Sequence, residues 1–353
     1  MNVKLKKFKI ASINLFNYLS PPSAYYDFEN IYSQAQWQKK QLWFRSFLSE
    51  HQPDIVGFQE VFSSKELSVL CKKQGLDYFA VVDKPEIMSD FIYKSQVVAI
   101  AARYPILAVE KVLPSEELVN HLGLNEFNFS RQVLRATIDL PSLGLCDFYV
   151  VHFKSKRANL NVSDENLPGL STSASIFAKQ FLGRWSADFQ RGNEAALLFH
   201  AMLQRREKTN QAMILLGDFN DNLHSGVLDA LNMQRKKIHS VDIKMSELSQ
   251  LPDHAINNSL KYYQLNDAHN LFIKTRDFKT MNHLRKSTHY YGTQGSVLDY
   301  ILLSNEFDTE CGASLAEVTS YETFDSHLIN PEYDIDSDST DHAPVMATIT
   351  IRS

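Results

Sequence analysis

The chain has 353 residues, of which 44% are hydrophobic and 22% charged, proportions typical of a soluble globular protein. This length accommodates two average domains or one large α/β domain. The formal net charge of −5 lacks the basic excess of proteins that grip nucleic acid tightly through its phosphates, although a local basic patch stays compatible with it.

Cysteine usage and hydropathy narrow the class of protein further. The three cysteines, Cys71, Cys146 and Cys311, are an odd number without a CxxC spacing. They predict neither a disulfide framework nor a structural zinc site, and they favour a reducing compartment. The N-terminal residues contain no secretory h-region, and no apolar run is long enough to cross a membrane, so a cytoplasmic location is the default expectation.

Short apolar runs recur along the chain, and most of them end in a polar residue that can take part in chemistry. The runs are Phe8–Ile13 before Asn14, Asp54–Phe58 before Gln59 and Glu60, Cys146–Val151 before His152, and Ala212–Gly217 before Asp218 and Asn220. A further run, Val297–Leu303, contains Asp299, and the last run, Val345–Ile351, follows Asp341 and His342. Near-continuous apolar runs of this kind predict strands that are buried on both faces of a sheet.

Helical patterns lie between these runs. Helices are predicted over Trp37–Glu50, Ser64–Gln74 and Asn193–Arg206, the second with Ser63 or Ser64 as a cap and Gly75 as a stop. Strands that alternate with helices predict an α/β or mixed-sheet architecture. Two segments, Asn159–Ser175 and Ser240–Ser259, are expected to be irregular loops.

The polar residues that end the runs suggest one shared site, because ligands collect at the carboxyl ends of strands in α/β sheets. Carboxylate, amide and imidazole groups that converge there suit the hydrolysis of phosphate esters. A divalent metal can neutralise the anionic phosphate while a base removes a proton from water. The oxygen ligands of Glu60, Asn14 and Asp341 favour Mg²⁺ or Mn²⁺ over zinc.

Six short motifs in a fixed order carry a family resemblance. They are Ile13-Asn14, Phe58-Gln59-Glu60-Val61, Val151-His152-Phe153-Lys154, Gly217-Asp218-Phe219-Asn220, Leu298-Asp299-Tyr300 and Ser339-Thr340-Asp341-His342. With them, residues 9–350 resemble the endonuclease/exonuclease/phosphatase superfamily, which has the deoxyribonuclease-I-like fold. The resemblance implies a four-layer α/β sandwich of two packed mixed β-sheets flanked by helices, with residues 1–353 as a single catalytic domain.

The resemblance also implies the metal site. Glu60 would be the principal ligand of Mg²⁺ or Mn²⁺, with Asn14 and Asp341 close by. Taken singly, Asn14 is better interpreted as a turn residue at a strand end, and a solvated loop residue is a reasonable interpretation of Glu60. The acidic run Glu332–Asp338 does not match an EF-hand loop, because the required glycine and glutamate are missing, so a solvated acidic loop is expected there.

Catalytic roles follow from the same resemblance. His342 would be the general base or an electrostatic partner of the phosphate, oriented by Asp299, which as a buried carboxylate needs a partner. Asp218 and Asn220 would position the attacking water and hold a phosphoryl oxygen, and His152 would donate a hydrogen bond to the phosphate. Whether His342 or Asp218 accepts the proton is left open by the sequence.

Substrate recognition is the least determined part. Lys154, Lys156 and Arg157 follow His152 and would neutralise further phosphates of a polymer, or else begin a solvated loop. Other residues that could extend this surface are Arg131, Arg184, Arg191, Tyr25, Tyr26, Trp37, Tyr290 and Tyr291.

The leading hypothesis is a Mg²⁺-dependent phosphodiesterase of nuclease type, with nucleic acid as a possible partner. A phosphomonoesterase similar to inositol phosphatases, or a lipid phosphodiesterase, on the same site is the alternative. A non-catalytic binding protein on this fold is a further, weaker alternative. The sequence does not determine the oligomeric state.

Overall fold

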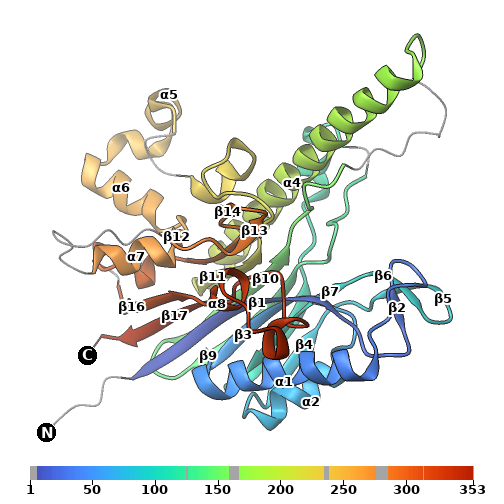
Figure 1. Cartoon of the computed structure of the whole chain (residues 1–353). Helices are drawn as coiled ribbons and strands as arrows, with labels where there is room; N and C mark the ends of the chain where they lie inside the picture. Colours follow the sequence, from blue (N-terminus) through green and yellow to red (C-terminus); the bar gives the residue numbers. More distant parts are fainter. Residues whose placement is uncertain are drawn as a thin grey trace, which may run out of the picture.

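Two six-stranded sheets lie face to face in the computed structural model of the chain, and helices cover their outer faces (Figure 1). The structure describes residues 6–124, 126–158, 167–233, 238–275, 285–312 and 314–352. The first sheet has the strand order β16 (Ala316–Thr323), β17 (Val345–Ile351), β1 (Lys7–Tyr18), β3 (Ile55–Val61), β7 (Val97–Ala102), β4 (Tyr78–Val81). The second has the order β12 (Asn266–Asp267), β15 (Asp299–Leu303), β11 (Ala212–Asp218), β10 (Gly144–His152), β9 (Leu134–Leu140), β8 (Ile106–Lys111).

Smaller elements complete the described chain. Two minor sheets pair β13 (His289–Tyr291) with β14 (Gln294–Ser296), and β6 (Ile92–Ser95) with β2 (Ala24–Tyr25) and β5 (Glu86–Ser89). The α-helices are α1 (Gln34–His51), α2 (Ser64–Lys73), α3 (Glu116–His121), α4 (Thr172–Thr209), α5 (Ser240–Lys244), α6 (Asp253–Lys261), α7 (Ala268–Lys274), α8 (Ser326–Ile329) and α9 (Tyr333–Asp336). The 3₁₀ helices are η1 (Gly226–Asn232), η3 (Glu247–Gln250) and η4 (Asn305–Phe307).

The predicted four-layer α/β sandwich with two mixed sheets is confirmed. Each large sheet has a parallel pair at its centre, β1 with β3 and β10 with β11, among antiparallel neighbours. Parallel neighbours end at the same edge of a sheet. For β10 and β11 that edge carries the polar residues predicted at the strand ends, His152 and Asp218.

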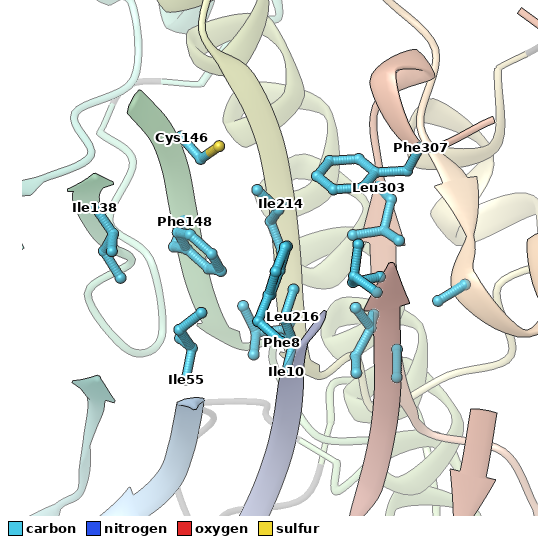
Figure 2. Packing of buried hydrophobic residues seen from close by; sticks show 14 of the residues in the cluster. Phe8, Ile10, Ile55, Ile138, Cys146, Phe148, Ile214, Leu216, Leu303 and Phe307 are labelled. Carbon is cyan, nitrogen blue, oxygen red and sulfur yellow. The ribbon is translucent and has the colours of Figure 1, made fainter. Parts of the chain in front are cut away.

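A continuous apolar core fills the space between the two sheets. Side chains of the first sheet, including Ile10 and Ile55, point toward Phe148 and Ile214 of the second (Figure 2). Intervening residues of the same strands face the helices on the other side, as Ala11 and Ile13 do beneath α1. Burial on both faces is the physical reason for the near-continuous apolar runs of the sequence.

The predicted helices near the N-terminus are confirmed with small changes at their ends. α1 begins at Gln34, where Ser33 and Gln36 form a reciprocal capping box, and it ends before Gln52 in the left-handed conformation. α2 covers the predicted range to within one residue. The Ser63 side chain does not cap it; the Ser63 hydroxyl instead accepts a hydrogen bond from the Ser20 amide.

Other helix predictions were too short or wrong. The predicted helix Asn193–Arg206 is the second half of the 38-residue α4. The segment Ser240–Ser259 was expected to be an irregular loop but holds α5, η3 and most of α6, whose Ile256 is buried. Residues 159–166 of the other predicted loop lie outside the described residues, whereas 172–175 form the first turn of α4.

Two strand predictions and the acidic-loop prediction also need correction. β1 continues beyond Asn14 to Tyr18 through a bulge in which Asn17 has a positive φ of 54°. Asp299 is the first residue of β15 and does not lie inside it. The acidic run contains α9, and the Trp43 indole donates to Asp336 Oδ1 at 2.9 Å, so this run packs on α1 and is not simply solvated.

Two further observations concern the cysteines and the helices of the described chain. Cys71, Cys146 and Cys311 are all free thiols. Across the described ranges, none of the helices has both the length and the apolar character that crossing a bilayer requires.

Gly217, the residue before Asp218, allows the close approach of β10 and β11. Its φ is +148°, and a Cβ atom built there would lie 2.0 Å from the Val151 carbonyl oxygen. Gly217→Ala is therefore expected to lower the free energy of unfolding by about 3 kcal/mol or more, because the strands must separate and the backbone is strained. Urea denaturation followed by circular dichroism measures this change.

Gly226→Ala is the matched control, since a Cβ atom at Gly226 meets no atom within 4 Å. It should change the free energy of unfolding by no more than about 0.5 kcal/mol. Equal stabilities of the Gly217 and Gly226 variants would contradict the proposed packing constraint.

Candidate active site

Three polar residues stand side by side at one edge of the second sheet. His152 ends β10 and pairs in register with Asp218, which ends the parallel strand β11. Asp218 in turn pairs with Asp299, the first residue of the antiparallel strand β15. Two parallel strand ends and one antiparallel strand start therefore place an imidazole and two carboxylates in a row. All three residues are buried, with 4%, 1% and 1% of their surface exposed.

His342 reaches this row from the loop before β17. Its Nδ1 lies 2.8 Å from Asp299 Oδ2, and its Nε2 lies 3.9 Å from Asp218 Oδ2. Because the carboxylate accepts from Nδ1–H, the ring is held in one orientation with Nε2 facing Asp218. The Asp299 Oδ1 atom is buried without a hydrogen-bond partner among the described residues.

The loop that carries His342 is fastened to several elements. The Thr340 hydroxyl donates to the Asn14 carbonyl of β1 at 2.7 Å and accepts from the His342 amide at 3.2 Å. The Ala343 amide donates to the Thr288 carbonyl at 2.7 Å, and the Thr288 hydroxyl accepts from the Asp299 amide at 3.2 Å. The same residues thus position both members of the Asp299–His342 pair.

Asp218, in the second sheet, forms a hydrogen bond with a residue of the first sheet. Its Oδ2 accepts from the Asn14 side-chain amide of the first sheet at 3.2 Å and from the Asn220 side-chain amide at 3.2 Å. Its Oδ1 accepts from the Asn220 backbone amide at 2.8 Å, and His152 Nε2 lies 3.4 Å from Oδ2. Asn220, with a φ of 54°, also donates to the Phe153 carbonyl at 3.0 Å.

The two imidazoles have opposite electrostatic surroundings. Burial, together with the positive charges of Arg131 and His342, holds the pKa of His152 well below its ordinary value, so this ring is neutral. Burial by itself lowers the pKa of His342, but the adjacent Asp299 and Asp218 carboxylates outweigh burial and raise that pKa well above its ordinary value. His342 is accordingly an imidazolium at neutral pH.

Burial raises the pKa of the Asp218 carboxyl group, and repulsion from Asp299 adds to this effect while His342 opposes it. A carboxylate with a raised pKa is a better proton acceptor than one in water. Asp218 is therefore the more suitable base of the two residues that the sequence left open.

Glu60 and Asp341 form a second acidic group next to this row. Glu60 has a φ of +61°, and its Oε2 accepts from the Asn17 amide at 2.8 Å. Burial raises the pKa of Glu60, and the negative charge of Asp341 raises it further. Two half-buried carboxylates that repel each other favour a cation between them.

The donor chemistry also fits a hard cation. The Asn14 Oδ1 atom accepts a hydrogen bond from the Phe16 amide at 3.0 Å, and the Asn17 Oδ1 atom is buried without a hydrogen-bond partner among the residues described. Ligand atoms of His289, Asp341 and His342 lie within 4.8 Å of one another. Of the three predicted oxygen ligands, this group contains Asp341 but neither Glu60 nor Asn14.

Lys40 is a residue near this acidic group that the sequence analysis missed. It is 1% exposed, and its Nζ donates to the Ser339 carbonyl at 2.6 Å, next to the loop of Asp341. The rings of Phe16, Tyr32 and Phe44 surround Nζ at 5.3–5.7 Å. Burial lowers the pKa of Lys40 to about 7, although Asp341 and Glu60 oppose this shift. The sequence did contain a signal for this residue: Lys40 lies between Trp37 and Phe44 on the apolar face of a predicted helix, where a buried lysine would be expected to have a specific role.

The sequence did not assign His289 to the site, and it named Arg131 only as a residue that could extend the substrate-binding surface. The His289 ring lies 5.0 Å from the His342 ring, and a β-bridge joins the two backbones. Arg131 acts electrostatically on Glu60, His152 and Lys154. Neither residue follows a predicted strand, so only the tertiary structure associates them with the site.

The predicted basic cluster lies beside His152, and its members differ in setting. Lys156 Nζ lies 2.7 Å from Asp221, and Arg157 is exposed. Lys154 is half-buried; its backbone amide donates to Glu194 at 2.7 Å and its carbonyl accepts from Arg191 at 2.8 Å. The prediction that Arg191 extends this surface was wrong, because Arg191 is fully buried and pairs with Asp188 and Asp221.

The aromatic candidates separate in the same way. Tyr291 is 84% exposed, whereas the Tyr290 hydroxyl lies 3.5 Å from Asp325. Trp37 was wrong as a rim residue: it is buried, with its ring centroid 4.7 Å from that of Tyr18. Tyr26 is partly exposed and donates to Gln96 at 3.0 Å.

Comparisons with known proteins bear on the family and the fold. A profile of the Endonuclease/Exonuclease/phosphatase family matches residues 30–342. The human Nocturnin catalytic domain with bound sulfate is 14% identical, with 98% of this chain and 95% of that chain covered and a TM-score of 0.52. D. rerio TDP2 complexed with a single-strand DNA product is 12% identical, with 98% and 99% covered and a TM-score of 0.51.

A third solved structure, the endonuclease/exonuclease/phosphatase from Bacteroides vulgatus, is 14% identical. It covers 98% of this chain and 100% of its own, with a TM-score of 0.51. No curated protein matches the chain significantly. At these identities the structural matches establish the fold alone.

Asp299→Asn tests the electrostatics of the site. The variant is expected to lower the pKa of His342 relative to the wild type, because it removes the negative charge of Asp299 and leaves the burial, while Asp218 still raises the pKa. NMR titration of the imidazole in the presence of EDTA measures this pKa. The wild-type imidazolium stabilises the fold below about pH 6.5, and this contribution is lost as the pH rises through the raised folded-state pKa. The variant should show a smaller pH-dependent loss, and at a lower pH.

Asp308→Asn serves as the control, since Asp308 is a buried aspartate whose partner is Lys274. It should leave the titration of His342 unchanged. A His342 pKa that is the same in wild type and in Asp299→Asn would contradict the assigned pairing.

Proposed function

Because the chain belongs to the Endonuclease/Exonuclease/phosphatase family, whose members hydrolyse phosphoesters, we propose that it is a Mg²⁺- or Mn²⁺-dependent phosphodiesterase of nuclease type. The observation that carries the proposal is the row of His152, Asp218, Asp299 and His342 beside the acidic pair of Glu60 and Asp341. We also propose that the whole chain acts as one catalytic domain, which the family match over residues 30–342 supports.

Glu60, Asp341 and Asn14 would hold the cation. A divalent cation bound there would neutralise charge on the phosphate and polarise its phosphorus–oxygen bonds. The fixed position of Glu60, whose carboxylate accepts from the Asn17 amide, supports its role as principal ligand. Lys40 would position the loop of Asp341 through the Ser339 carbonyl.

Asp218 would act as the general base. It would accept a proton from a water molecule as the water oxygen forms a bond to phosphorus and the bond to the leaving oxygen breaks. Its raised pKa supports this role, and the imidazolium state of His342 argues against His342 as the acceptor. Asn220 and Asn14 hold the Asp218 carboxylate in place.

The two histidines would act on the phosphoryl oxygens. His342, held by Asp299, would place a positive charge against the oxygens as negative charge develops on them. His152 would donate from Nε2, since its lowered pKa leaves it one ring proton. Lys154, Lys156 and Arg157 would contact neighbouring phosphates of a polymer from the adjacent loop.

Glu60→Ala tests the proposal. It is expected to lower Mg²⁺-dependent cleavage of plasmid and oligonucleotide by at least about a hundredfold, because the principal metal ligand is lost. Gel assays and a fluorogenic oligonucleotide measure the rate, and EDTA should abolish wild-type activity until Mg²⁺ or Mn²⁺ is restored. Glu66→Ala is the control: Glu66 is an exposed residue in the first turn of α2, and the variant should retain wild-type activity.

The choice of substrates separates the alternatives. Release of phosphate from small monoesters without cleavage of polynucleotides would replace the nuclease assignment by a phosphomonoesterase. A steep fall of polymer cleavage with salt would support contact with several phosphates. If the wild type cleaved no phosphoester with either metal, the enzymatic proposal itself would fail.

A further inference from the structure

The first half of α4 carries a row of exposed aromatic side chains. Phe177, Phe181, Trp185 and Phe189 recur every fourth residue, and their exposed fractions are 74%, 54%, 66% and 50%. Residues four apart lie on one side of a helix, so these rings form a single ridge, here called the aromatic ridge. The N-terminal half of α4 extends beyond the two large sheets (Figure 1).

Several contacts hold this part of α4 in a defined conformation. The Ser171 hydroxyl caps the helix by accepting from the Ala174 amide at 3.4 Å. On the side away from the aromatic ridge, Gly183 and Ala187 are buried. Gln190 donates to the Asn128 carbonyl at 2.8 Å. The aromatic ridge is thus presented by an ordered helix.

Neighbouring rings of the aromatic ridge contact one another in pairs. Trp185 and Phe189 stack with centroids 5.6 Å apart, and Phe177 and Phe181 meet edge to face at 6.3 Å. With an area of about 200 Å² for each aromatic side chain, the four together expose roughly 500 Å². The largest apolar patch on a monomeric protein is typically about 300–600 Å² and is often functional, so this patch is a candidate binding surface.

The charges around the aromatic ridge favour an anionic partner. At about 100° per residue, Arg184 falls beside the ridge, whereas Lys179 falls on the opposite face of the helix. The acidic residue of this half, Asp188, pairs with Arg191. Lys154 and Arg157 lie close to the middle of α4, where the aromatic ridge ends, since Arg191 donates to the Lys154 carbonyl. This positive setting contrasts with the overall charge of −5.

The shape and composition of the aromatic ridge favour a bilayer over other partners. Aromatic side chains flanked by lysine and arginine are typical of helices that lie in a membrane interface. A pair of such ridges from two copies would bury only about 1,000 Å², at the lower limit for a specific protein interface. Residues 159–166, which lie outside the described residues, contain only Leu160 and Val162 as apolar residues.

We propose that the N-terminal half of α4 is an interfacial arm that inserts the aromatic ridge into the surface of an anionic lipid bilayer. Arg184 contacts a lipid phosphate while the rings enter the boundary between headgroups and acyl chains. The protein then lies on the bilayer as a peripheral protein, with the basic residues beside His152 close to the lipid surface. This association is independent of the substrate that the catalytic site hydrolyses.

Vesicle flotation with the full chain tests the proposal. The probes are vesicles of phosphatidylcholine alone and of phosphatidylcholine mixed with phosphatidylglycerol. The wild type is expected to float with the anionic vesicles. The double variant Phe177→Ser, Phe181→Ser is expected to bind these vesicles with an affinity at least about tenfold lower. Leu113→Ser, which changes a 72% exposed apolar residue elsewhere, should bind like the wild type.

Tryptophan fluorescence supplies an independent readout. Of the three tryptophans, Trp37 is buried and Trp43 half-buried, so a blue shift on adding vesicles reports mainly on Trp185. Trp185→Phe should still float, because the aromatic ridge stays apolar, but should lose most of the blue shift. Hydrolysis of a soluble phosphodiester should be the same in all these variants.

Three results would overturn the proposal. One is no association of the wild type with either vesicle. Another is equal flotation of the wild type and the double serine variant. The third combines two observations: the wild type does not bind vesicles, and substitution of the ridge changes another property. A lower mass of the variant in light scattering would show that the ridge binds a second copy. A lower affinity of the variant for single-stranded oligonucleotide would show that it binds nucleic acid.

Discussion

The buried carboxylate of Asp218 is the constraint on which the rest of the candidate site depends. A carboxylate removed from water requires hydrogen-bond donors, and here they come from both halves of the sandwich. Asn14 donates from the first sheet, and Asn220 donates from the turn that follows β11. The register of β10, β11 and β15 then brings His152 and Asp299 alongside. The site is therefore complete only when the two sheets are packed together.

The surroundings of Asp218 divide the work among chemically similar groups. Two imidazoles lie within 4 Å of the same oxygen, yet the Asp299 carboxylate keeps His342 charged while burial keeps His152 neutral. A neutral ring can donate one proton in a hydrogen bond, whereas a charged ring stabilises developing negative charge. Lys40 donates to the Ser339 carbonyl in the loop of Asp341, and it has no ion pair among the described residues.

α4 links the catalytic edge to the surface of the molecule. Its second half packs on the second sheet through residues such as Leu198 and Met202. In its middle, Arg191 and Glu194 bind the backbone of Lys154 and so fix the loop after His152. Its first half bears the aromatic ridge. A ligand held by this half would therefore be mechanically connected, through one helix, to the basic residues beside the site.

The sequence by itself determined the fold class, the order of the motifs and most of the candidate site residues. It could do so because burial on both faces makes strands apolar, and a polar residue that ends such a run stands out. It could not place Lys40, His289 or Arg131, whose proximity to the site depends on contacts between distant segments. It also placed Trp37 and Arg191 at the surface, although packing buries both. Only the tertiary structure decided protonation, because the charge of His152 or His342 depends on neighbours that lie far away in the chain.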